Sequence, residues 1–248
     1  MSDSLVIIPM YNEKENAAAI IDAVLKLPVD FDILVIDDNS PDGTAAIVKE
    51  KIAADPTRVN IIERAGKLGL GTAYIEGFKW ALDKGYDYIC EMDADFSHNP
   101  DDLVRLREAL AEDRGDVAVG SRYVSGVNVV NWPMGRVLMS FYASKYVRIV
   151  TGMKVRDTTA GFVCYKRKVL EAMNLDAIRF KGYAFQIEMK FTARQLGFRI
   201  VEVPIVFVNR VLGTSKMSSG IFGEALFGVM RLKWSAITGE MRRRHKKQ

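Results

Sequence analysis

The chain has 248 residues, of which 49% are hydrophobic and 27% are charged. This is an ordinary globular composition, long enough to bury a full core in one large domain or two small ones. The net charge is +4, but five positive charges lie in the last eight residues, MRRRHKKQ, which leaves −1 on the rest. The near-neutral body argues against a nucleic-acid-binding domain. A basic tail keeps a terminus soluble or contacts an anionic surface such as lipid head groups.

Cysteine content and hydropathy indicate the compartment. Cys90 and Cys164 form no CxxC motif, and a chain of this size needs no disulfide staples, so a reducing compartment fits. The first residues, MSDS, lack the basic start of a secretory leader. No run of 18 or more uncharged apolar residues occurs, so we expect no membrane-spanning helix. These features predict a cytoplasmic protein that can lie on a membrane without crossing it.

The first half of the chain alternates short apolar runs with helical patterns. The expected strands cover residues 5–10, 31–38, 59–65, 86–93 and 116–123. The expected helices cover residues 13–27, 44–54, 72–84 and 100–110. Asn12, with Glu15 three residues later, resembles the start of a capping box. The rhythm predicts an α/β fold with a mostly parallel, doubly wound sheet, in which ligands bind beyond the carboxyl ends of the strands.

The second half has a different pattern. Helices are expected at residues 136–150, 185–196 and 220–238, and strands at 161–170, running into a turn or helix, and at 198–208. Pro204 inside the last strand indicates an edge position or a bulge. We expect one continuous domain over residues 1–219, followed by an amphipathic helix and a basic tail over residues 220–248. The glycines of GKLGLG (66–71) follow the third strand and predict a tight turn, not a dinucleotide site.

Acidic residues gather where two predicted strands end. One strand ends in Asp37 and Asp38, and another runs into Glu91, Asp93 and Asp95. Alternate residues of an extended segment point to the same side, so Asp93 and Asp95 would share one face at the mouth of the sheet. Two such carboxylates suit Mg²⁺ or Mn²⁺, which take one or two carboxylates together with phosphate oxygens. A solvated strand end, where aspartate is common, is the simpler alternative.

Seven short motifs occur in a fixed order along the chain. They are PMYNE (9–13), DDNSPDGT (37–44), GLGTAY (69–74), MDAD (92–95), GSRY (120–123), DTTAGF (157–162) and FVNRVLGTSKM (207–217). Together they resemble the GT-A-fold, family 2 glycosyltransferases, and specifically the dolichol/polyprenol-phosphate mannose synthases. The resemblance implies a Rossmann-like GT-A fold and an inverting transfer of mannose from GDP-mannose to a polyprenyl or dolichyl phosphate.

The resemblance also implies which residues hold the nucleotide sugar and a metal. The residues expected at the nucleotide sugar are Pro9, Tyr11, Glu13, Asp38, Asp93, Ala94, Arg210 and Lys216. Asp93 and Asp95 match the family's metal motif, and Asp95 would ligate a Mg²⁺ or Mn²⁺ that bridges the diphosphate. Ser97 stands where some members carry a further ligand, although a hydroxyl is a poor one. His98 is interpreted as a loop residue, and Glu91 receives no role.

Basic residues are expected at the phosphates. Arg122 matches a family residue near the phosphates, and Arg136 and Ser140, one helical turn apart, match positions that hold the lipid phosphate. Asp95, Arg122 and Arg136 are therefore the predicted catalytic residues. Arg210 and Lys216 lie in a segment that closes over the diphosphate in the family. The simpler alternatives are a surface ion pair for Arg122 and a solvated basic loop for the segment.

A lipid acceptor implies contact with a membrane. Residues 136–150 and 220–238 combine large apolar side chains with Lys and Arg, as interfacial helices do, although a core-facing helix gives a similar stripe. We therefore expect a peripheral enzyme on the cytoplasmic face of a membrane, with no nucleic acid bound. Its own helices or a membrane-anchoring partner subunit would hold it there.

Two other functions stay open at this stage. One is a family 2 transferase that uses UDP-glucose or another nucleotide sugar with the same kind of acceptor. The other is a non-catalytic subunit that binds nucleotide sugar. The joint presence of Asp93, Asp95, Arg122, Arg136 and Lys216 argues against the second, because a scaffold has no need of that set.

Overall fold

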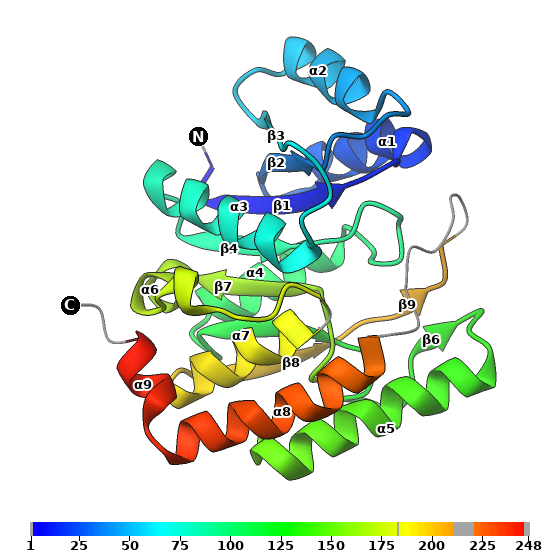
Figure 1. Cartoon of the computed structure of the whole chain (residues 1–248). Helices are drawn as coiled ribbons and strands as arrows, with labels where there is room; N and C mark the ends of the chain where they lie inside the picture. The colour runs from blue at the N-terminus through cyan, green and yellow to red at the C-terminus, as the bar shows by residue number, and fades with distance from the viewer. Residues whose placement is uncertain (1, 183, 211–220, 246–248) are drawn as a thin grey trace.

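The computed structural model describes residues 2–182, 184–210 and 221–245, with side chains from residue 227 onward in the last segment. Seven strands form one sheet in the order β3-β2-β1-β4-β7-β5-β8 (Figure 1). They are β1 (Ser4–Met10), β2 (Asp32–Asp37), β3 (Val59–Glu63), β4 (Tyr88–Glu91), β5 (Val117–Ser121), β7 (Val163–Lys166) and β8 (Ile200–Pro204). Only β7 runs antiparallel to its neighbours in this sheet. The predicted mostly parallel α/β sheet is confirmed.

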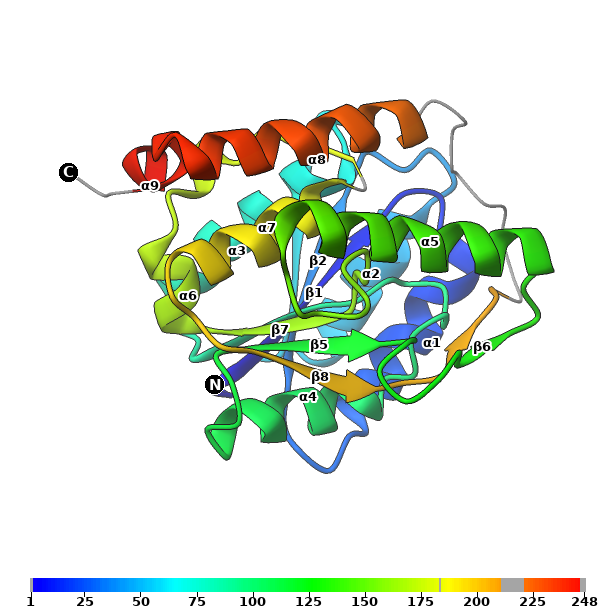
Figure 2. The same ribbon diagram turned by 90° about the horizontal axis from the view of Figure 1, so that it is seen from below.

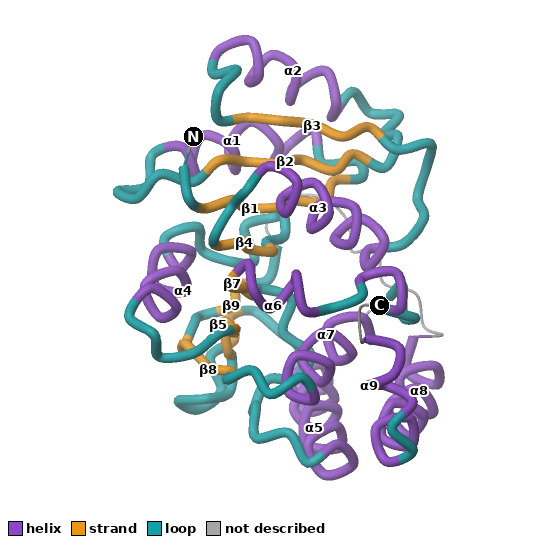
Figure 3. Tube along the Cα trace, turned by 90° about the vertical axis from the view of Figure 1, so that its left-hand side faces the viewer, coloured by secondary structure: helices purple, strands orange, loops and turns teal. Residues whose placement is uncertain are grey.

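Helices cover both faces of the sheet (Figure 3). They are α1 (Lys14–Leu25), α2 (Thr44–Ala54), α3 (Leu70–Lys84), α4 (Asp102–Ala111), α5 (Met134–Thr151), α6 (Arg167–Ala172), α7 (Ala184–Gln195), α8 (Ile221–Ile237) and α9 (Glu240–His245). Ile20, Val48 and Leu106 bring α1, α2 and α4 onto one face of the sheet. Tyr74 and Phe185 belong to the core on the other face, which α3, α6 and α7 cover. The strands are buried on both faces, which explains their nearly continuous apolar sequences.

An outer layer is built from α5 and α8, which lie side by side over α7 (Figure 2). Val147 of α5, Phe191 of α7 and Val229 of α8 share one small core with Met241 of α9. Part of the segment predicted as a basic tail is helical, since α9 extends to His245. Met241 and His245 are buried, which holds this helix against the protein. No helix in the described ranges is long and apolar enough to cross a membrane.

The start of α1 corrects one prediction. Asn12 adopts a left-handed conformation with φ 53°, and Glu13 occupies the N-cap position without a side-chain cap bond. Side chains of the turn between β2 and α2 accept hydrogen bonds from the backbone N–H groups of residues 12–14 instead. The predicted capping box is wrong because a neighbouring turn satisfies these donors. The turn thereby fixes the segment that follows β1.

Several predicted strands end earlier than expected, and two of these changes affect the site. The strand at 86–93 ends at Glu91, so Asp93 and Asp95 lie in the following turn and not on an extended segment. The strand at 198–208 is divided into β8 and β9 (Phe207–Val208), and β9 pairs with β6 (Val129–Val130) in a separate small sheet. Pro204 ends β8, an edge strand of the main sheet, as its missing N–H predicts.

Candidate active site

The parallel strands β1, β2, β4, β5 and β8 all end at one edge of the sheet, as the arrowheads of β1 in Figure 1 and of β5 and β8 in Figure 2 show. This topology brings together the segments that follow β1, β2, β4 and β5. The backbone strengthens the arrangement, since the Asp38 N–H donates to the Met10 carbonyl and the Met92 N–H donates to the Ile7 carbonyl. Motifs that are far apart in the sequence therefore meet at the edge where parallel sheets bind ligands.

A tight turn after β4 carries the paired carboxylates. The Ser97 N–H donates to Asp95 Oδ1 at 3.0 Å, and Phe96 takes a left-handed conformation with φ 57°. The turn buries Asp95 to 7% exposure, whereas the Asp93 side chain stays 42% exposed. Ala94 between them is buried. The two carboxylates therefore have different surroundings, and Asp95 is the one fixed by the backbone.

Positive charge from another part of the fold reaches this turn. Arg210, which follows β9, places Nη2 2.7 Å from Asp95 Oδ2 and Nη1 4.0 Å from Glu13 Oε1. Partial removal from bulk water, then the charge of Asp95, raises the pKa of Asp93 toward about 7. Arg210 and the solvent that reaches this 42%-exposed side chain both limit the rise. Among the described residues, Arg210 and then Arg122 thus compensate this concentration of negative charge only in part.

The residues of this turn fit a divalent cation that is shared with a ligand. No group of three or more His, Cys, Asp or Glu side chains suited to a metal occurs within the described residues. Mg²⁺ and Mn²⁺ need only one or two protein carboxylates when a diphosphate supplies further oxygens, and Asp93 with Asp95 meets that requirement. Ser97 Oγ is buried in the same turn and has no hydrogen-bond partner among the residues that the structure describes. This hydroxyl oxygen is the additional metal ligand that the turn could provide.

His98 has a structural role in the same turn. Its ring stacks on Phe162 at 4.7 Å between centroids and meets Phe207 edge-on at 5.3 Å. Burial lowers the pKa of His98 to about 4, so the imidazole is neutral at pH 7. Its Nδ1 accepts a hydrogen bond from the Asp93 N–H at 3.3 Å. His98 therefore positions the backbone of the acidic turn, and its approach to the Asp93 carboxylate is not an ion pair at neutral pH.

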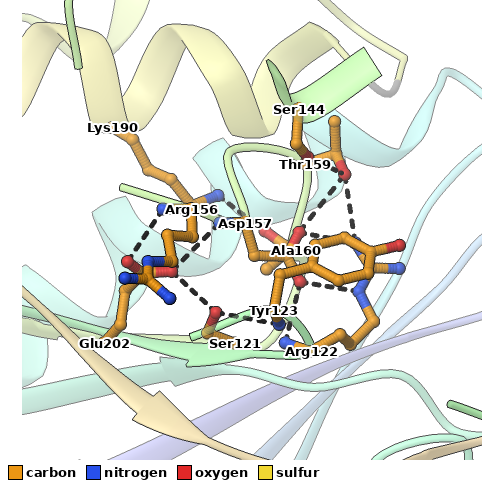
Figure 4. A network of polar contacts seen from close by, with 10 residues as sticks. All are labelled: Ser121, Arg122, Tyr123, Ser144, Arg156, Asp157, Thr159, Ala160, Lys190 and Glu202. Atoms are coloured by element: carbon orange, nitrogen blue, oxygen red, sulfur yellow. Dashed lines mark hydrogen bonds and ion pairs between the residues drawn. The ribbon is translucent and has the colours of Figure 1, made fainter. Parts of the chain in front are cut away.

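Arg122 is held in a buried ion pair at the end of β5 (Figure 4). Its Nε and Nη2 donate to the two carboxylate oxygens of Asp157, each at 2.7 Å, and its backbone N–H donates to Asp157 Oδ2. Nη2 also donates to Thr159 Oγ1 at 3.0 Å. Burial lowers the pKa of Arg122, but the facing carboxylate outweighs burial and the net pKa is raised. The simpler alternative of a surface ion pair is wrong, because the pair is buried and Arg122 is only 8% exposed.

Further buried polar groups support Asp157 (Figure 4). Glu202 of β8 accepts hydrogen bonds from the backbone N–H groups of Arg156 and Asp157 and from Ser121 Oγ. Lys190 of α7 donates to the Ala160 carbonyl at 2.6 Å. Glu202 and Lys190 thus fix the segment 156–160. Because Arg122 is bonded to Asp157 in this segment, its guanidinium is held in place as well.

Glu91, which had no role in the sequence, lies in the core beneath the acidic turn. It is fully buried, and Gln186 Nε2 of α7 donates to its Oε2 at 2.6 Å. Burial raises the pKa of Glu91 to about 8 and lowers that of Lys190 to about 8, and the two groups interact electrostatically. Glu91 therefore links β4 to α7 and is not a candidate ligand.

Arg136 and Arg122 approach the same aromatic ring. The guanidinium carbon of Arg136 lies 4.1 Å from the centre of the Trp132 ring, and that of Arg122 lies 5.5 Å from it. Arg136 Nη1 also donates to Asn209 Oδ1 at 3.1 Å. Tyr123, beside Arg122, packs edge-on against Phe141 of α5 and interacts with Ser140. The three residues expected at the lipid phosphate thus each contact an aromatic residue: Arg122 and Arg136 contact Trp132, and Ser140 contacts Tyr123.

Four of the residues expected at the nucleotide lie at the end of β1 or just after β1 and β2. Pro9 pairs with Ile36 beyond the point where β4 leaves β1, and Tyr11 packs under Lys67, whose Nζ lies 5.1 Å from the ring centre. Burial raises the pKa of Asp38, an effect that Arg64 opposes from 3.3 Å. Lys216 lies outside the described residues.

Several supporting residues escaped prediction. Asp157 belongs to the motif DTTAGF, so a signal for it was present without a role. Arg64, buried beside Asp38 and bonded to Thr72 Oγ1 at 2.6 Å, follows a strand as an ordinary residue of the sequence. Trp132 and Glu202 carry no local signal. Their roles depend on contacts between distant segments.

Comparison with known proteins identifies the family. Residues 5–173 match glycosyl transferase family 2. The chain belongs to this family. It is 49% identical over 227 residues to a polyprenol monophosphomannose synthase of Mycolicibacterium smegmatis, covering 91% of this chain and 85% of that protein. It is 47% identical over 241 residues to an undecaprenyl-phosphate mannosyltransferase of Micrococcus luteus, covering 96% of this chain and 98% of that one.

Solved structures share the fold of this glycosyltransferase. Glucosyl-3-phosphoglycerate synthase of Mycobacterium tuberculosis, in complex with Mn²⁺, UDP and glucosyl-3-phosphoglycerate, has a TM-score of 0.65 at 18% identity, covering 95% of this chain and 80% of that one. A mannosyltransferase of Pyrobaculum calidifontis, in complex with GDP-mannose and Mn²⁺, has a TM-score of 0.58 at 16% identity, covering 96% and 74%. These likenesses establish the GT-A type of α/β fold.

Proposed function

We propose that this glycosyltransferase transfers mannose from GDP-mannose to a polyprenyl phosphate, with inversion at the anomeric carbon. The two family relatives, named as mannose-transferring enzymes with polyprenol-type acceptors, support the sugar and the acceptor. The observation that carries the proposal is that an acidic turn and a set of arginines lie at the same edge of the sheet. An acidic turn with Asp93 and Asp95 faces Arg210, and Arg122 and Arg136 share the ring of Trp132.

On the donor side, Asp93 and Asp95 would hold Mg²⁺ or Mn²⁺ together with the diphosphate of the nucleotide sugar. A bound divalent cation supplies positive charge to the departing GDP. Arg210, already at the carboxylate of Asp95, is close enough to add charge to the same diphosphate. Pro9, Tyr11, Glu13 and Asp38 would bind the guanosine, since carboxylates accept hydrogen bonds from a guanine edge or from ribose hydroxyls.

On the acceptor side, the chemistry needs no general base. A phosphate monoester has a second pKa near ~6, so the attacking oxygen is already anionic at pH 7. The protein must instead hold two anions close together. Arg136 and Ser140 would bind the lipid phosphate, and Arg122, held rigid by Asp157, would stabilise charge between acceptor and donor. One displacement on the sugar then inverts the anomeric centre.

The lipid acceptor requires a membrane, and α5 and α8 are the surfaces that suit it. Large apolar side chains of both helices are exposed, among them Met134, Tyr142 and Ile149 of α5 and Phe227 and Trp234 of α8. Lys145, Arg148 and the basic residues of α9 accompany them. We infer that these helices lie in the interface on the cytoplasmic face of a membrane, alone or beside an anchoring subunit. Residues 220–248 would then form the interfacial part of the chain and residues 1–219 its catalytic domain.

The experiment that tests the function compares donors. Purified protein is incubated with a polyprenyl phosphate and with radiolabelled GDP-mannose or UDP-glucose, each with Mn²⁺, Mg²⁺ or chelator, and the label in the organic phase is measured. The proposal predicts lipid-linked mannose only with a divalent cation, and a β-linked product. Label in the organic phase from UDP-glucose but not from GDP-mannose would refute GDP-mannose as the donor and identify UDP-glucose instead. An α-linked product would refute the single displacement.

A further inference from the structure

A pocket that shares no lining residue with the candidate site at the sheet edge lies between α8, α9 and the loop before α7. Its volume is about 480 Å³, and its walls include Arg179, Arg231 and Arg244 together with Phe180, Phe227 and Leu232. None of these side chains has a role in the proposed transfer. Three guanidinium groups around an apolar floor form an unusual surface for a structural contact, because like charges repel unless an anion joins them.

The arginines of this pocket are only partly compensated. Arg179 Nη2 and Arg244 Nε share Glu240, whose Oε1 lies 2.8 Å and 3.6 Å away from them. Burial, then the charges of Arg179 and Arg231, lowers the pKa of Arg244. Arg231 is exposed and forms no ion pair with an acidic residue among the described residues. Among the described residues around the pocket, positive charge therefore exceeds negative charge.

The fold holds this arrangement rigidly. The buried carboxylate of Glu188 accepts the backbone N–H groups of Arg179 and Phe180 at 2.8 and 2.9 Å, and lies 4.0 Å from Arg244. Arg244 Nη1 donates to the Ala177 carbonyl at 3.0 Å. A Cβ on Gly228 would lie 2.6 Å from the ring of Phe180, so only glycine lets α8 approach this floor. The pocket is therefore preformed, with a cationic rim and an apolar floor.

The position of the pocket beside an exposed apolar stripe indicates which kind of ligand can enter it. Four exposed apolar residues of α8 recur every three or four positions and form one stripe: Phe227, Met230, Trp234 and Ile237. On a helical wheel Arg231 borders one side of this stripe and Lys233 borders the other. Phe227 belongs to both the stripe and the pocket. A molecule that enters the pocket from an apolar phase at this stripe would place its head group among the arginines.

We propose that this pocket binds the phosphate head group of an anionic phospholipid from the bilayer on which the protein lies. The inference rests on the proposed function only in that the lipid acceptor brings the protein to a membrane. The arginines bind the phosphate through charge-assisted hydrogen bonds, and the aromatic floor covers the first carbons of the lipid. Free phosphate would contact the rim but would leave the floor exposed.

The test compares two single substitutions on the same helix. Arg231→Gln and Lys233→Gln each remove one positive charge beside the stripe, but only Arg231 lines the pocket. Flotation with vesicles of phosphatidylcholine alone, and of phosphatidylcholine with phosphatidylglycerol, gives the affinity of each protein without donor or acceptor. If the two residues only add positive charge near the membrane, either substitution should lower the affinity for phosphatidylglycerol vesicles about fivefold. The pocket predicts a loss of at least about tenfold for Arg231→Gln, on phosphatidylglycerol vesicles only.

Equal losses for the two variants, or no loss for Arg231→Gln, would overturn the proposal. Unchanged thermal unfolding of both variants excludes misfolding as the cause. In solution, short-chain phosphatidylglycerol should bind the wild type at least about tenfold more tightly than inorganic phosphate, because only the lipid covers the floor. Equal affinities would make the pocket a free-phosphate site and would refute the lipid. Since these readouts need no sugar transfer, they can fail while the proposed function holds, and the reverse.

Discussion

Replacing Asp157 by Asn tests the buried ion pair that fixes Arg122. Asp157 is fully buried and accepts three hydrogen bonds from Arg122, two of them from the guanidinium at 2.7 Å. Asparagine keeps the shape but removes the charge and turns an NH₂ group toward a donor. Breaking a buried pair leaves an uncompensated cation and costs about 3–5 kcal/mol. For a chain of this length that corresponds to a fall in Tm of about 6–20 °C.

Urea or thermal unfolding measures this loss, and Asp113→Asn is the matched control. Asp113 also forms two ion pairs at 2.7 Å, with Lys166 and Arg199, but its side chain is 68% exposed. Solvent screens an exposed ion pair, so this variant should be nearly as stable as the wild type. Equal losses for Asp157→Asn and Asp113→Asn, or a loss below about 1 kcal/mol for the former, would refute the buried pair as a major structural support of the site.

Three further predictions concern packing, pH and the membrane surface. Gly71→Ala should lower stability by about 1–3 kcal/mol, because its Cβ would lie 2.8 Å from the Phe180 carbonyl oxygen, whereas Gly66→Ala meets nothing within 4 Å and should be neutral by urea unfolding. Without divalent cations the raised pKa of Asp93 favours its protonated form in the folded state. That contribution to stability is present below pH about 4 and is lost as pH rises through about 7. Mn²⁺ should restore part of the Tm at pH 8, and the difference in Tm between wild type and Asp93→Asn should narrow at pH 5. Trp234→Ser should weaken flotation with phosphatidylcholine vesicles several-fold, because the side chain is exposed in the apolar stripe of α8.

Each of these has a contrary outcome. Equal stability of the two glycine variants would mean that α3 can move away from the loop before α7. A difference in Tm between wild type and Asp93→Asn that does not change with pH would show that the carboxylate keeps its ordinary pKa. Unchanged flotation of Trp234→Ser would remove α8 from the membrane interface.

The sheet could be predicted because its strands are buried on both faces. Such strands appear as continuous apolar runs between helical patterns, and β1 and α2 lie within a residue or less of where periodicity predicts them. Strand ends were less predictable, because they depend on pairing. β4 stops at Glu91, where its partner β7 begins at Val163. The two-residue strands β6 and β9 have too little sequence to give a pattern.

The candidate site also has parts that the sequence could predict and parts that it could not. Asp93, Asp95 and Arg122 follow strands and carry motifs, so the sequence indicates them. Their surroundings come from distant segments, and no local pattern could indicate that Asp157 would neutralise Arg122 or that Arg210 would reach Asp95 across the site. The capping prediction for α1 failed for the same reason, since the donors there bond to the turn before α2.

The most direct test of the account is transfer of radiolabelled mannose from GDP-mannose to a polyprenyl phosphate by wild type and by Asp95→Asn. Asp95 is the carboxylate that both the Ser97 N–H and Arg210 hold in place. Wild type should put label into the lipid phase with Mn²⁺ and lose this activity with chelator. Asp95→Asn should fall by at least about a hundredfold in kcat, since a group that stabilises developing charge is lost, while its unfolding stays cooperative. Equal lipid-linked mannose from both proteins, or from wild type after removal of divalent cations, would contradict the account.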